Sequence, residues 1–392
     1  MDVVRIGIIG LGNMGTGHMR NILDGKVPRL TLTAVADLLP ERRAAARDLC
    51  KEKLQFDTFP TIFESGKDLI ESDVCDAVLI AVPHYQHPAL TISALQHGKH
   101  VLCEKPAGVY TKQVREMNEA AANSDRVFAM MFNQRTNCLY RKMHELVTSG
   151  ELGAIKRVNW IITNWYRPQI YYDSGSWRAT WSGEGGGVLL NQCPHNLDLL
   201  QWICGLPVRV RAFCHNGKWH NIEVEDDVTA YMEFPNGATG VFVTSTADAP
   251  GTNRFEITLE RGKLVCEDDK LLLWKLKESE RDFCRTAKGG FDKPECTFEE
   301  VETDGLNEQH VGVMKAFVGR ILDGTPLVAE GAEGIRGLTL SNAMHLSSWL
   351  NQTVEIPFDE DLFLDELDKR CETSAAKNTA AVTFDTSGSY NS

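Results

Sequence analysis

The stretch VVRIGIIGLGNMG, residues 3–15, joins an apolar strand to a glycine-rich turn. Its apolar residues do not alternate with polar ones, which is typical of a strand buried on both faces. Gly10, Gly12 and Gly15 follow the spacing G-x-G-x-x-G, ahead of a segment compatible with a helix. In such a unit the first glycine allows a tight turn, the second lets the backbone approach a ligand, and the third permits close helix packing. The stretch therefore predicts the first strand-turn-helix unit of a doubly wound parallel sheet.

The rest of the first third of the chain repeats this pattern of buried strands. Four more apolar runs are separated by helix-length segments: LTLTAVAD, DAVLIAVP, HVLCEKP and RVFAMMFN. They predict an α/β domain over residues 1–130, with helices on both faces of a parallel sheet.

The pattern changes from about residue 155. Segments such as DVTAYMEFP and ATGVFVTST alternate apolar and polar residues, and turn signals such as PNG lie between them. They predict a mostly antiparallel sheet with one apolar face, which a helix or a partner chain must cover. The length of 392 residues also favours two domains, so we expect a second, α+β domain at residues 131–370 and a tail at 371–392.

The composition excludes several classes of protein. Hydrophobic residues make up 43% of the chain and charged residues 24%, as in soluble globular enzymes. The net charge of −13 argues against binding to nucleic acid or to an anionic membrane surface. No segment approaches the ~18 apolar residues of a membrane span and none resembles a signal peptide, so we expect a cytoplasmic location. The eleven cysteines contain no C-x-x-C pair, and we predict neither a disulfide framework nor a metal site.

The glycine-rich turn also predicts a cofactor. The backbone N–H groups at a helix N-terminus, here around Asn13 and Met14, can bind the phosphates of a dinucleotide. Asp37 ends the second strand, where a carboxylate accepts hydrogen bonds from ribose hydroxyls and repels a 2′-phosphate. NAD is therefore favoured over NADP, although Arg42 and Arg43 lie nearby in the sequence. A strand-turn-helix unit that binds nothing is the alternative.

Four motifs occur in a specific order along the chain: GLGNMG, AVPHYQHPA, HVLCEKPAG and GGGVLLNQCPHNLD. Together they resemble the motifs of the glucose-fructose oxidoreductase, inositol dehydrogenase and MocA (Gfo/Idh/MocA) family, from residue 4 to about residue 365. The resemblance implies a Rossmann domain followed by a domain with a large open sheet that often mediates oligomers, so we expect a homodimer or homotetramer. It also implies NAD(P)-dependent oxidation or reduction of a sugar, inositol or glycoside hydroxyl.

The segment Cys103-Glu104-Lys105-Pro106 lies at the carboxyl end of a predicted parallel strand, where open α/β sheets bind their ligands. The resemblance implies that Pro106 is cis and that Lys105 hydrogen-bonds the reacting hydroxyl and stabilises its alkoxide. A surface lysine at a turn is the alternative. Glu104 contacts the nicotinamide ribose or merely holds the strand end. Further positions resemble the lining of the cofactor cleft: Val82, His84, His87 and Asn133.

The stretch GGGVLLNQCPHNLDLL, residues 185–200, carries the remaining catalytic candidates. Pro194 predicts a helix that begins there, with Asn191 on the lead-in loop. The resemblance implies that His195 is the general base, since a neutral imidazole accepts a proton near pH 7. Family members commonly have Asp where this chain has Asn191, so Asn191 is expected to hydrogen-bond a substrate hydroxyl. Asp198 either orients His195 and contacts substrate or pairs elsewhere.

The segment between the two domains is dense in aromatic residues and arginine. Aromatic faces pack on the C–H faces of sugar rings and arginines bind their hydroxyls, although a covered core edge or a subunit contact has the same composition. The substrate-binding candidates here are Trp165, Arg167, Tyr172, Trp177, Arg178 and Trp181. Three functions follow: NAD-dependent oxidation of a ring hydroxyl, with C3 of a glucoside as one position; a redox-assisted glycosidase or lyase that retains NAD; and a non-catalytic NAD-binding sensor.

Overall fold

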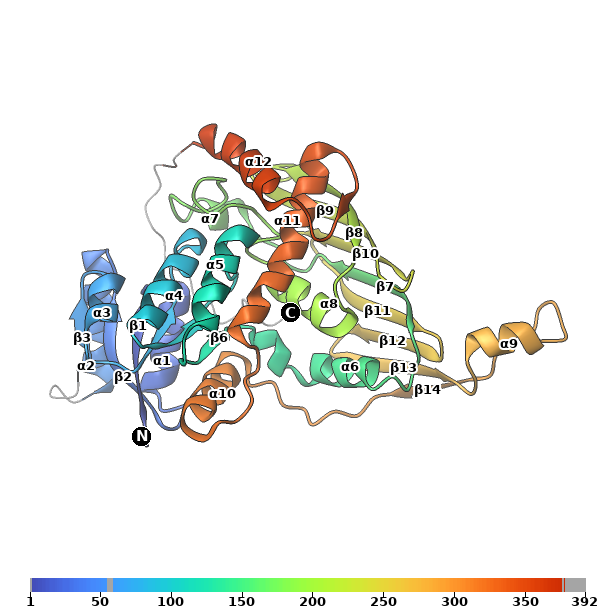
Figure 1. Ribbon diagram of the computed structural model, residues 1–392, viewed down its shortest axis with the longest axis horizontal. Coiled ribbons are helices and arrows are strands. Elements are labelled where there is room, and N and C mark those ends of the chain that lie inside the picture. The colour runs from blue at the N-terminus through green and yellow to red at the C-terminus, as the bar shows by residue number, and fades with distance from the viewer. Residues whose placement is uncertain (1, 55–58, 376, 378–392) are drawn as a thin grey trace.

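The computed structural model describes residues 2–54, 59–375 and 377, and it contains two sheets arranged one beside the other (Figure 1). Most of the expected tail at 371–392 lies outside the described residues, and its first two residues belong to helix α12 (Glu360–Glu372). Within the described ranges, no helix combines the length and the apolar character needed to cross a membrane.

The first sheet is parallel throughout and has the strand order β3-β2-β1-β4-β5-β6. Its strands are β1 (Val4–Ile9), β2 (Leu30–Ala36), β3 (Thr61–Phe63), β4 (Ala77–Ile80), β5 (His100–Cys103) and β6 (Phe128–Met130). The helices between them are α1 (Asn13–Leu23), α2 (Pro40–Lys53), α3 (Gly66–Glu71), α4 (His87–Gln96) and α5 (Thr111–Ala122). The doubly wound parallel sheet is therefore confirmed. The sequence does not predict β3, because its three residues are too few to show a pattern.

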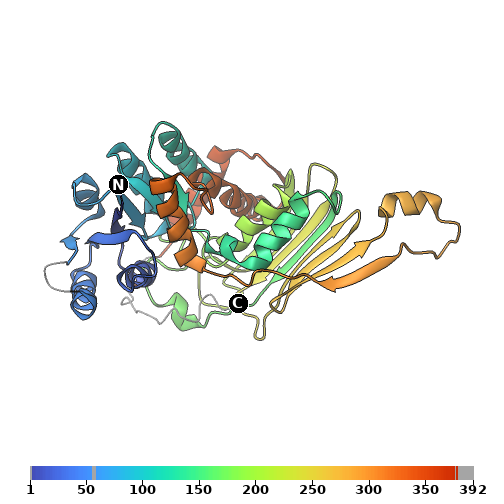
Figure 2. The same ribbon diagram turned by 90° about the horizontal axis from the view of Figure 1, so that it is seen from below.

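A late helix returns to this first sheet. Helix α10 (Gln309–Asp323) places Val313, Met314 and Phe317 in the same apolar cluster as the residues of β1. Figure 2 shows α10 beside the helices of the first domain. The first structural unit thus includes a segment from the C-terminal part of the chain, which a boundary at residue 130 leaves out.

The second sheet is mostly antiparallel, as predicted, and only β7 and β10 pair in parallel. Its order is β14-β13-β12-β11-β7-β10-β9-β8-β15. The strands are β7 (Ile155–Ile162), β8 (Arg209–Asn216), β9 (Glu225–Glu233), β10 (Thr239–Ser245), β11 (Asn253–Leu259), β12 (Gly262–Glu267), β13 (Lys270–Leu276), β14 (Cys296–Glu300) and β15 (Val354–Glu355).

Helices cover one face of the second sheet (Figures 1 and 2). They are α6 (Cys138–Thr148), α8 (Pro194–Cys204) and α11 (Gly334–Leu350). Beneath them the sheet contributes Trp160 and Phe255, which stack with ring centroids 4.0 Å apart. Large apolar side chains elsewhere on the sheet are exposed, namely Ile161, Phe213 and Tyr231.

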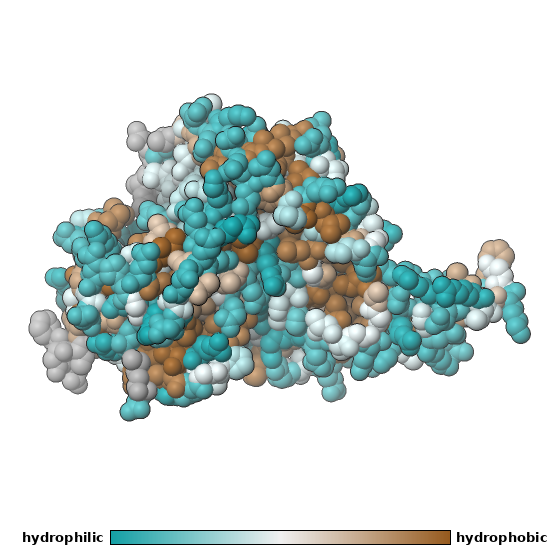
Figure 3. Space-filling model, in the orientation of Figure 1, coloured by the Kyte–Doolittle hydropathy of each residue, from teal (hydrophilic) through white to brown (hydrophobic). Residues whose placement is uncertain are grey.

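An arm projects from the far edge of the second sheet. It consists of β13, helix α9 (Glu280–Thr286) and β14, and Figure 3 shows that it is mostly hydrophilic with a more apolar tip. Phe291, in the loop after α9, is 99% exposed. Three short helices complete the positioning of the site: η2 (His84–Gln86), η3 (Asn133–Thr136) and α7 (Gln169–Tyr172). A fourth, η4 (Gly331–Glu333), precedes α11.

Candidate active site

The glycine loop has the shape that the sequence predicts for a dinucleotide cradle. Gly10 has φ +94°, which favours glycine, and a Cβ on Gly15 would lie 1.8 Å from the Gly10 carbonyl oxygen. A Cβ on Gly12 would instead project into open space, where the nearest atom is Nη1 of Arg42 at 3.9 Å. Asn13 and Met14 form the first turn of α1, so its N-terminus faces this space. The loop therefore fits the pyrophosphate of NAD.

Asp37 lies beside the loop, at the end of β2. Its Oδ2 accepts a hydrogen bond from the Leu11 N–H at 2.7 Å, and its Oδ1 accepts one from the Leu39 N–H at 2.9 Å. Nη1 of Arg42 is 3.5 Å from the same carboxylate. The carboxylate is thus held rigidly where the adenine ribose of a bound dinucleotide would lie.

Replacing Asp37 with Asn is expected to shift cofactor preference toward NADP by tenfold or more. A hydrogen bond to a charged group contributes about 1.5–3 kcal/mol, and each 1.4 kcal/mol is about tenfold in affinity. The amide keeps an acceptor for the Leu11 N–H but no longer repels a 2′-phosphate. Titration of both cofactors gives the affinity ratio, and Asp48→Asn on the exposed face of α2 is the control. An unchanged ratio in Asp37→Asn would contradict the assignment.

Lys105 follows β5 and points toward the second domain. The Lys105–Pro106 peptide bond is cis, as the resemblance implies. The Lys105 Nζ donates a hydrogen bond to the main-chain oxygen of Asn191 at 2.9 Å, so the two catalytic candidates from distant parts of the chain are in contact. Burial lowers the pKa of Lys105 below its ordinary value, while the carboxylates of Glu104 and Glu184 oppose that change.

Glu104 holds the end of β5 against α1. Its Oε1 lies 2.6 Å from Nε2 of His18, and both side chains are buried. Burial alone would raise the pKa of Glu104, but the hydrogen bond and the charge of His18 outweigh it and lower that pKa to about 2. The sequence does not single out His18; its position one turn after Gly15 on α1 is the signal that could have found it. Glu104 therefore holds the strand end, one of the two roles expected for it.

His195 is the second residue of α8, which begins at Pro194 as predicted. Its side chain is buried, and among the described residues neither ring nitrogen has a hydrogen-bond partner. Burial and the neighbouring charge of Lys105 lower the pKa of His195 well below 6.5, so the imidazole is neutral. Buried polar atoms are rarely left unpaired in proteins, so water or a bound molecule is expected to supply a partner for the His195 ring. The buried Nδ1 of His84, Oδ1 of Asn133 and Nε of Arg178 are unpaired in the same way.

Asp198 is part of a buried ion pair and does not orient His195. Nε and Nη2 of Arg135 each donate to its carboxylate at 2.7 Å, and Gln201 donates to it at 3.0 Å. Both carboxylate oxygens are used and the side chain is 1% exposed, so of the two alternatives for Asp198 the structure has pairing elsewhere and not contact with His195 or substrate. Arg135 comes from η3, and the sequence gives no sign that it meets α8.

Asn191 lies on the loop before α8, as predicted, but its amide contacts protein groups on both sides. Its Nδ2 donates to Oε1 of Glu184, and its Oδ1 accepts from the Tyr171 hydroxyl at 3.2 Å. Nη1 of Arg178 donates to the same hydroxyl at 2.7 Å. Each end of the amide therefore has one protein partner, and its second N–H and second lone pair remain for a substrate hydroxyl, so this role of Asn191 stays a prediction.

Glu184 and Tyr171 are site residues that the sequence analysis missed. Glu184 precedes the three glycines of GEGGG, and Tyr171 stands beside the candidate Tyr172. A charged residue flanked by glycines was the only local signal, because a glycine-rich backbone can bring it close to other chain segments.

Three of the aromatic candidates belong to the protein core. The Trp165 indole N–H donates to Asn196 Oδ1 at 3.1 Å, and the Tyr172 hydroxyl donates to Thr246 Oγ1 at 2.7 Å. The Trp181 ring packs against His345 and Trp349. These candidates are buried by packing against other residues, so their assignment to substrate is wrong: Trp165, Tyr172 and Trp181.

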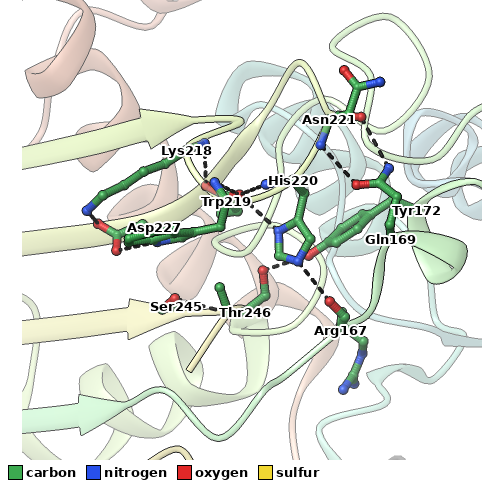
Figure 4. Close-up of polar contacts among 12 residues, drawn as sticks. Arg167, Gln169, Tyr172, Lys218, Trp219, His220, Asn221, Asp227, Ser245 and Thr246 are labelled. Atoms are coloured by element: carbon green, nitrogen blue, oxygen red, sulfur yellow. Dashed lines mark hydrogen bonds and ion pairs between the residues drawn. The ribbon is translucent and has the colours of Figure 1, made fainter. Parts of the chain in front are cut away.

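A histidine whose side chain is only 8% exposed fixes the loop that carries Arg167. In Figure 4 the His220 ring lies on Tyr172 and points one nitrogen at the main-chain oxygen of Arg167, at 2.8 Å. Its other ring nitrogen is 2.9 Å from the buried Asp226 carboxylate. Three partly exposed residues remain together as a candidate sugar-binding surface: Arg167, Trp177 and Arg178.

His87 ties two loops together instead of facing a cofactor. Its Nδ1 is 2.7 Å from the Pro106 oxygen, and its Nε2 is 2.8 Å from the Val82 oxygen. Because carbonyl groups occupy both ring nitrogens, the expected cofactor contact of His87 is corrected to a structural one. Val82 is half-buried at the end of β4, and the His84 ring lies 5.6 Å from Trp177. The Asn133 amide donates to Gln309.

Comparison with known proteins agrees with this geometry. A model described as an oxidoreductase family with an NAD-binding Rossmann fold matches residues 4–132, and one described as a GFO/IDH/MocA C-terminal domain matches residues 140–265. Myo-inositol 2-dehydrogenase of Thermotoga maritima is 25% identical over 90% of this chain and 98% of its own length. Levoglucosan dehydrogenase of Pseudarthrobacter phenanthrenivorans is 25% identical over 68% of this chain and 74% of its own.

The fold also matches solved structures. The WlbA dehydrogenase of Chromobacterium violaceum, solved in complex with NADH and UDP-GlcNAcA, is 25% identical, with a TM-score of 0.75 over 92% of this chain and 97% of that one. The two family models together match well over half of the chain, in the order in which the two sheets occur. The chain belongs to the Gfo/Idh/MocA family of NAD-binding oxidoreductases.

Proposed function

We propose that this protein is an NAD-dependent dehydrogenase that oxidises a ring hydroxyl of a sugar, glycoside or inositol. The observation that carries the proposal is the contact between Lys105 and the loop that leads to His195, at the carboxyl end of β5 and close to the glycine loop. The names of two similar proteins, an inositol and a levoglucosan dehydrogenase, support the same class of substrate.

Different side chains have different roles in the oxidation of the hydroxyl. NAD, when bound, accepts the hydride from the carbon that is oxidised. Lys105 lies where it can hydrogen-bond the hydroxyl and take its proton, and burial makes its amine more available near neutral pH than that of an ordinary lysine. His195 is neutral and neither of its ring nitrogens has a partner among the described residues, so it can accept the hydroxyl proton as the general base and share that role with Lys105. Trp177 and Arg178 provide an aromatic face and hydrogen-bond donors for the ring.

Absorbance of NADH, measured with NAD and a panel of sugars, glycosides and inositols, tests the proposal. Steady formation of NADH supports the dehydrogenase. Release of product without net NADH would favour the redox-assisted glycosidase or lyase that retains NAD. If neither occurs with any substrate, the non-catalytic NAD-binding sensor is favoured, although such a sensor has no need of Lys105 and His195.

We also propose that the protein is a homodimer or homotetramer. The exposed apolar side chains of the second sheet support this, since an uncovered apolar sheet surface is usually buried against a partner. Light scattering on the purified protein gives the number of subunits, and a monomer at micromolar concentration would contradict the proposal.

A further inference from the structure

Glu184 is a buried carboxylate in contact with the active site, and the proposed mechanism leaves it without a role. Its Oε2 accepts a hydrogen bond from the Ala179 N–H at 2.5 Å, and its Oε1 accepts one from Nδ2 of Asn191. Nη1 of Arg178 lies 3.7 Å from Oε1. Burial raises the pKa of Glu184, while the charge of Arg178 and the N–H donors of Ala179 and Asn191 oppose that rise and favour the ionised carboxylate. Only 1% of Glu184 is exposed, and both of its oxygens already accept hydrogen bonds from protein groups.

This carboxylate determines how the Asn191 amide is turned. An ionised carboxylate can only accept hydrogen bonds, so the Asn191 NH₂ group must face Glu184 and its Oδ1 must face Tyr171. The Tyr171 hydroxyl then donates to Oδ1 and accepts from Arg178 at 2.7 Å. Each hydrogen bond in this chain of contacts therefore has a fixed donor and a fixed acceptor, and the Glu184 carboxylate determines which is which.

Asn191 connects this chain of contacts to the catalytic lysine. Its side chain is held by Glu184, and its main-chain oxygen accepts the hydrogen bond of Lys105 Nζ at 2.9 Å. We propose that Glu184 is a positioning residue whose carboxylate, through Asn191, holds the Lys105 amino group in the active site and supplies the negative charge that Asn191 lacks. The inference rests on the proposed dehydrogenase function for its kinetic consequences only.

The charges around Lys105 determine the sign of the expected effect. Glu104 and Glu184 favour its protonated form, whereas Arg178 and Arg167 disfavour it. Three buried imidazoles, each with a lowered pKa, add little charge of their own: His84, His195 and His310. Burial also lowers the pKa of His87, but the two carbonyl oxygens at its ring nitrogens favour the protonated ring. Removing the charge of Glu184 leaves the two arginines less opposed, so the pKa of Lys105 falls.

Two single variants and their combination separate the role of the charge from that of packing. In Glu184→Gln, one end of the new amide meets a donor that it cannot pair with, either Asn191 or Ala179. In Asn191→Asp, two buried carboxylates face one another and must share a proton. In the double variant, the amide introduced at position 184 donates to the carboxylate introduced at position 191 and accepts from the Ala179 N–H. Every hydrogen bond is then restored, and the charge moves to position 191.

The pH dependence of Lys105 acetylation by acetic anhydride, followed by peptide mass spectrometry, tests the proposal without any substrate. In Glu184→Gln the midpoint should move to lower pH by about one unit. In the double variant it should return to the wild-type value or above. Glu260→Gln is the control, because Glu260 also accepts a backbone N–H, from Ala154, but in the turn between β11 and β12. The proposal is overturned if the midpoint pH of Lys105 acetylation is unchanged in Glu184→Gln, or if it is lowered in the double variant. If Glu184→Gln does not fold, the midpoint pH of the double variant decides.

Steady-state kinetics with a substrate that the protein oxidises supply the second measurement. We expect kcat of Glu184→Gln to fall about 10- to 100-fold with a smaller change in KM, since misplacement of a catalytic group by about 1 Å costs on the order of 10²-fold. The double variant should recover most of this loss. If the wild-type protein oxidises no substrate, the proposed function fails, while the acetylation midpoint still decides the role of Glu184.

Discussion

Replacing Lys105 with Met is expected to lower kcat for oxidation by about 10³-fold and to leave NAD binding almost unchanged. General acid–base catalysis contributes about 10²–10⁴-fold, and Met keeps the length of the side chain without a group that can take a proton. In the proposed site NAD is bound mainly by the glycine loop and Asp37, whereas Lys105 Nζ hydrogen-bonds the main chain of Asn191. The loss should therefore appear in kcat, because the missing interaction is made in the transition state.

The pH profile provides an independent test of the same residue. In the wild-type protein kcat/KM for oxidation should rise with pH through an apparent pKa below the ordinary lysine value of 10.5, because only the deprotonated amine accepts a proton. The residual activity of Lys105→Met should lack this rise. Lys112→Met is the matched control, since Lys112 is an exposed lysine of α5 paired with Asp361. A Lys105→Met protein with wild-type kcat would refute the assignment.

Replacing Arg135 with Met is expected to reduce the free energy of unfolding by about 3–5 kcal/mol. Breaking a buried ion pair leaves an uncompensated charge, and here the Asp198 carboxylate is 1% exposed and loses both of its 2.7 Å hydrogen bonds to Arg135. The effect reaches beyond Asp198, because Arg135 also donates to Glu333 at 2.8 Å. Unfolding in urea, followed by fluorescence, measures the loss.

The pH dependence of Arg135→Met follows from the same charge. Burial raises the pKa of Asp198 and Arg135 opposes it, so without the arginine the carboxyl group is protonated in the folded state and ionised in the unfolded state. The folded state then binds the extra proton, and stability falls as pH rises above about 4. The double variant Arg135→Met, Asp198→Leu should recover most of the loss. If it does not, the loss comes from packing of the guanidinium on Phe132 and Trp202.

Features that depend on residues close together in the chain follow from its sequence, and features that depend on distant residues do not. The parallel sheet, the start of α8 at Pro194 and the position of Lys105 after β5 depend on residues close together in the chain, and these predictions are confirmed. The return of α10 to the first sheet has no local signal, because the partner of its apolar face lies in the first strands. The prediction of sugar-binding residues in the aromatic segment between the domains was partly wrong for the same reason. The composition of a segment does not distinguish a sugar-binding surface from a packed core.

The sequence by itself determined the glycine loop, the two kinds of sheet and the lysine at the end of β5. Backbone conformation and the apolar pattern of a strand depend on residues that are close together in the sequence, so distant residues do not change them. Only the tertiary structure decided the partner of each buried carboxylate. Asp198 pairs with Arg135, which is 63 residues away, and Glu184 accepts a hydrogen bond from Asn191. A charge must be neutralised by whatever group the folded chain brings within about 4 Å, and the sequence order does not specify that group.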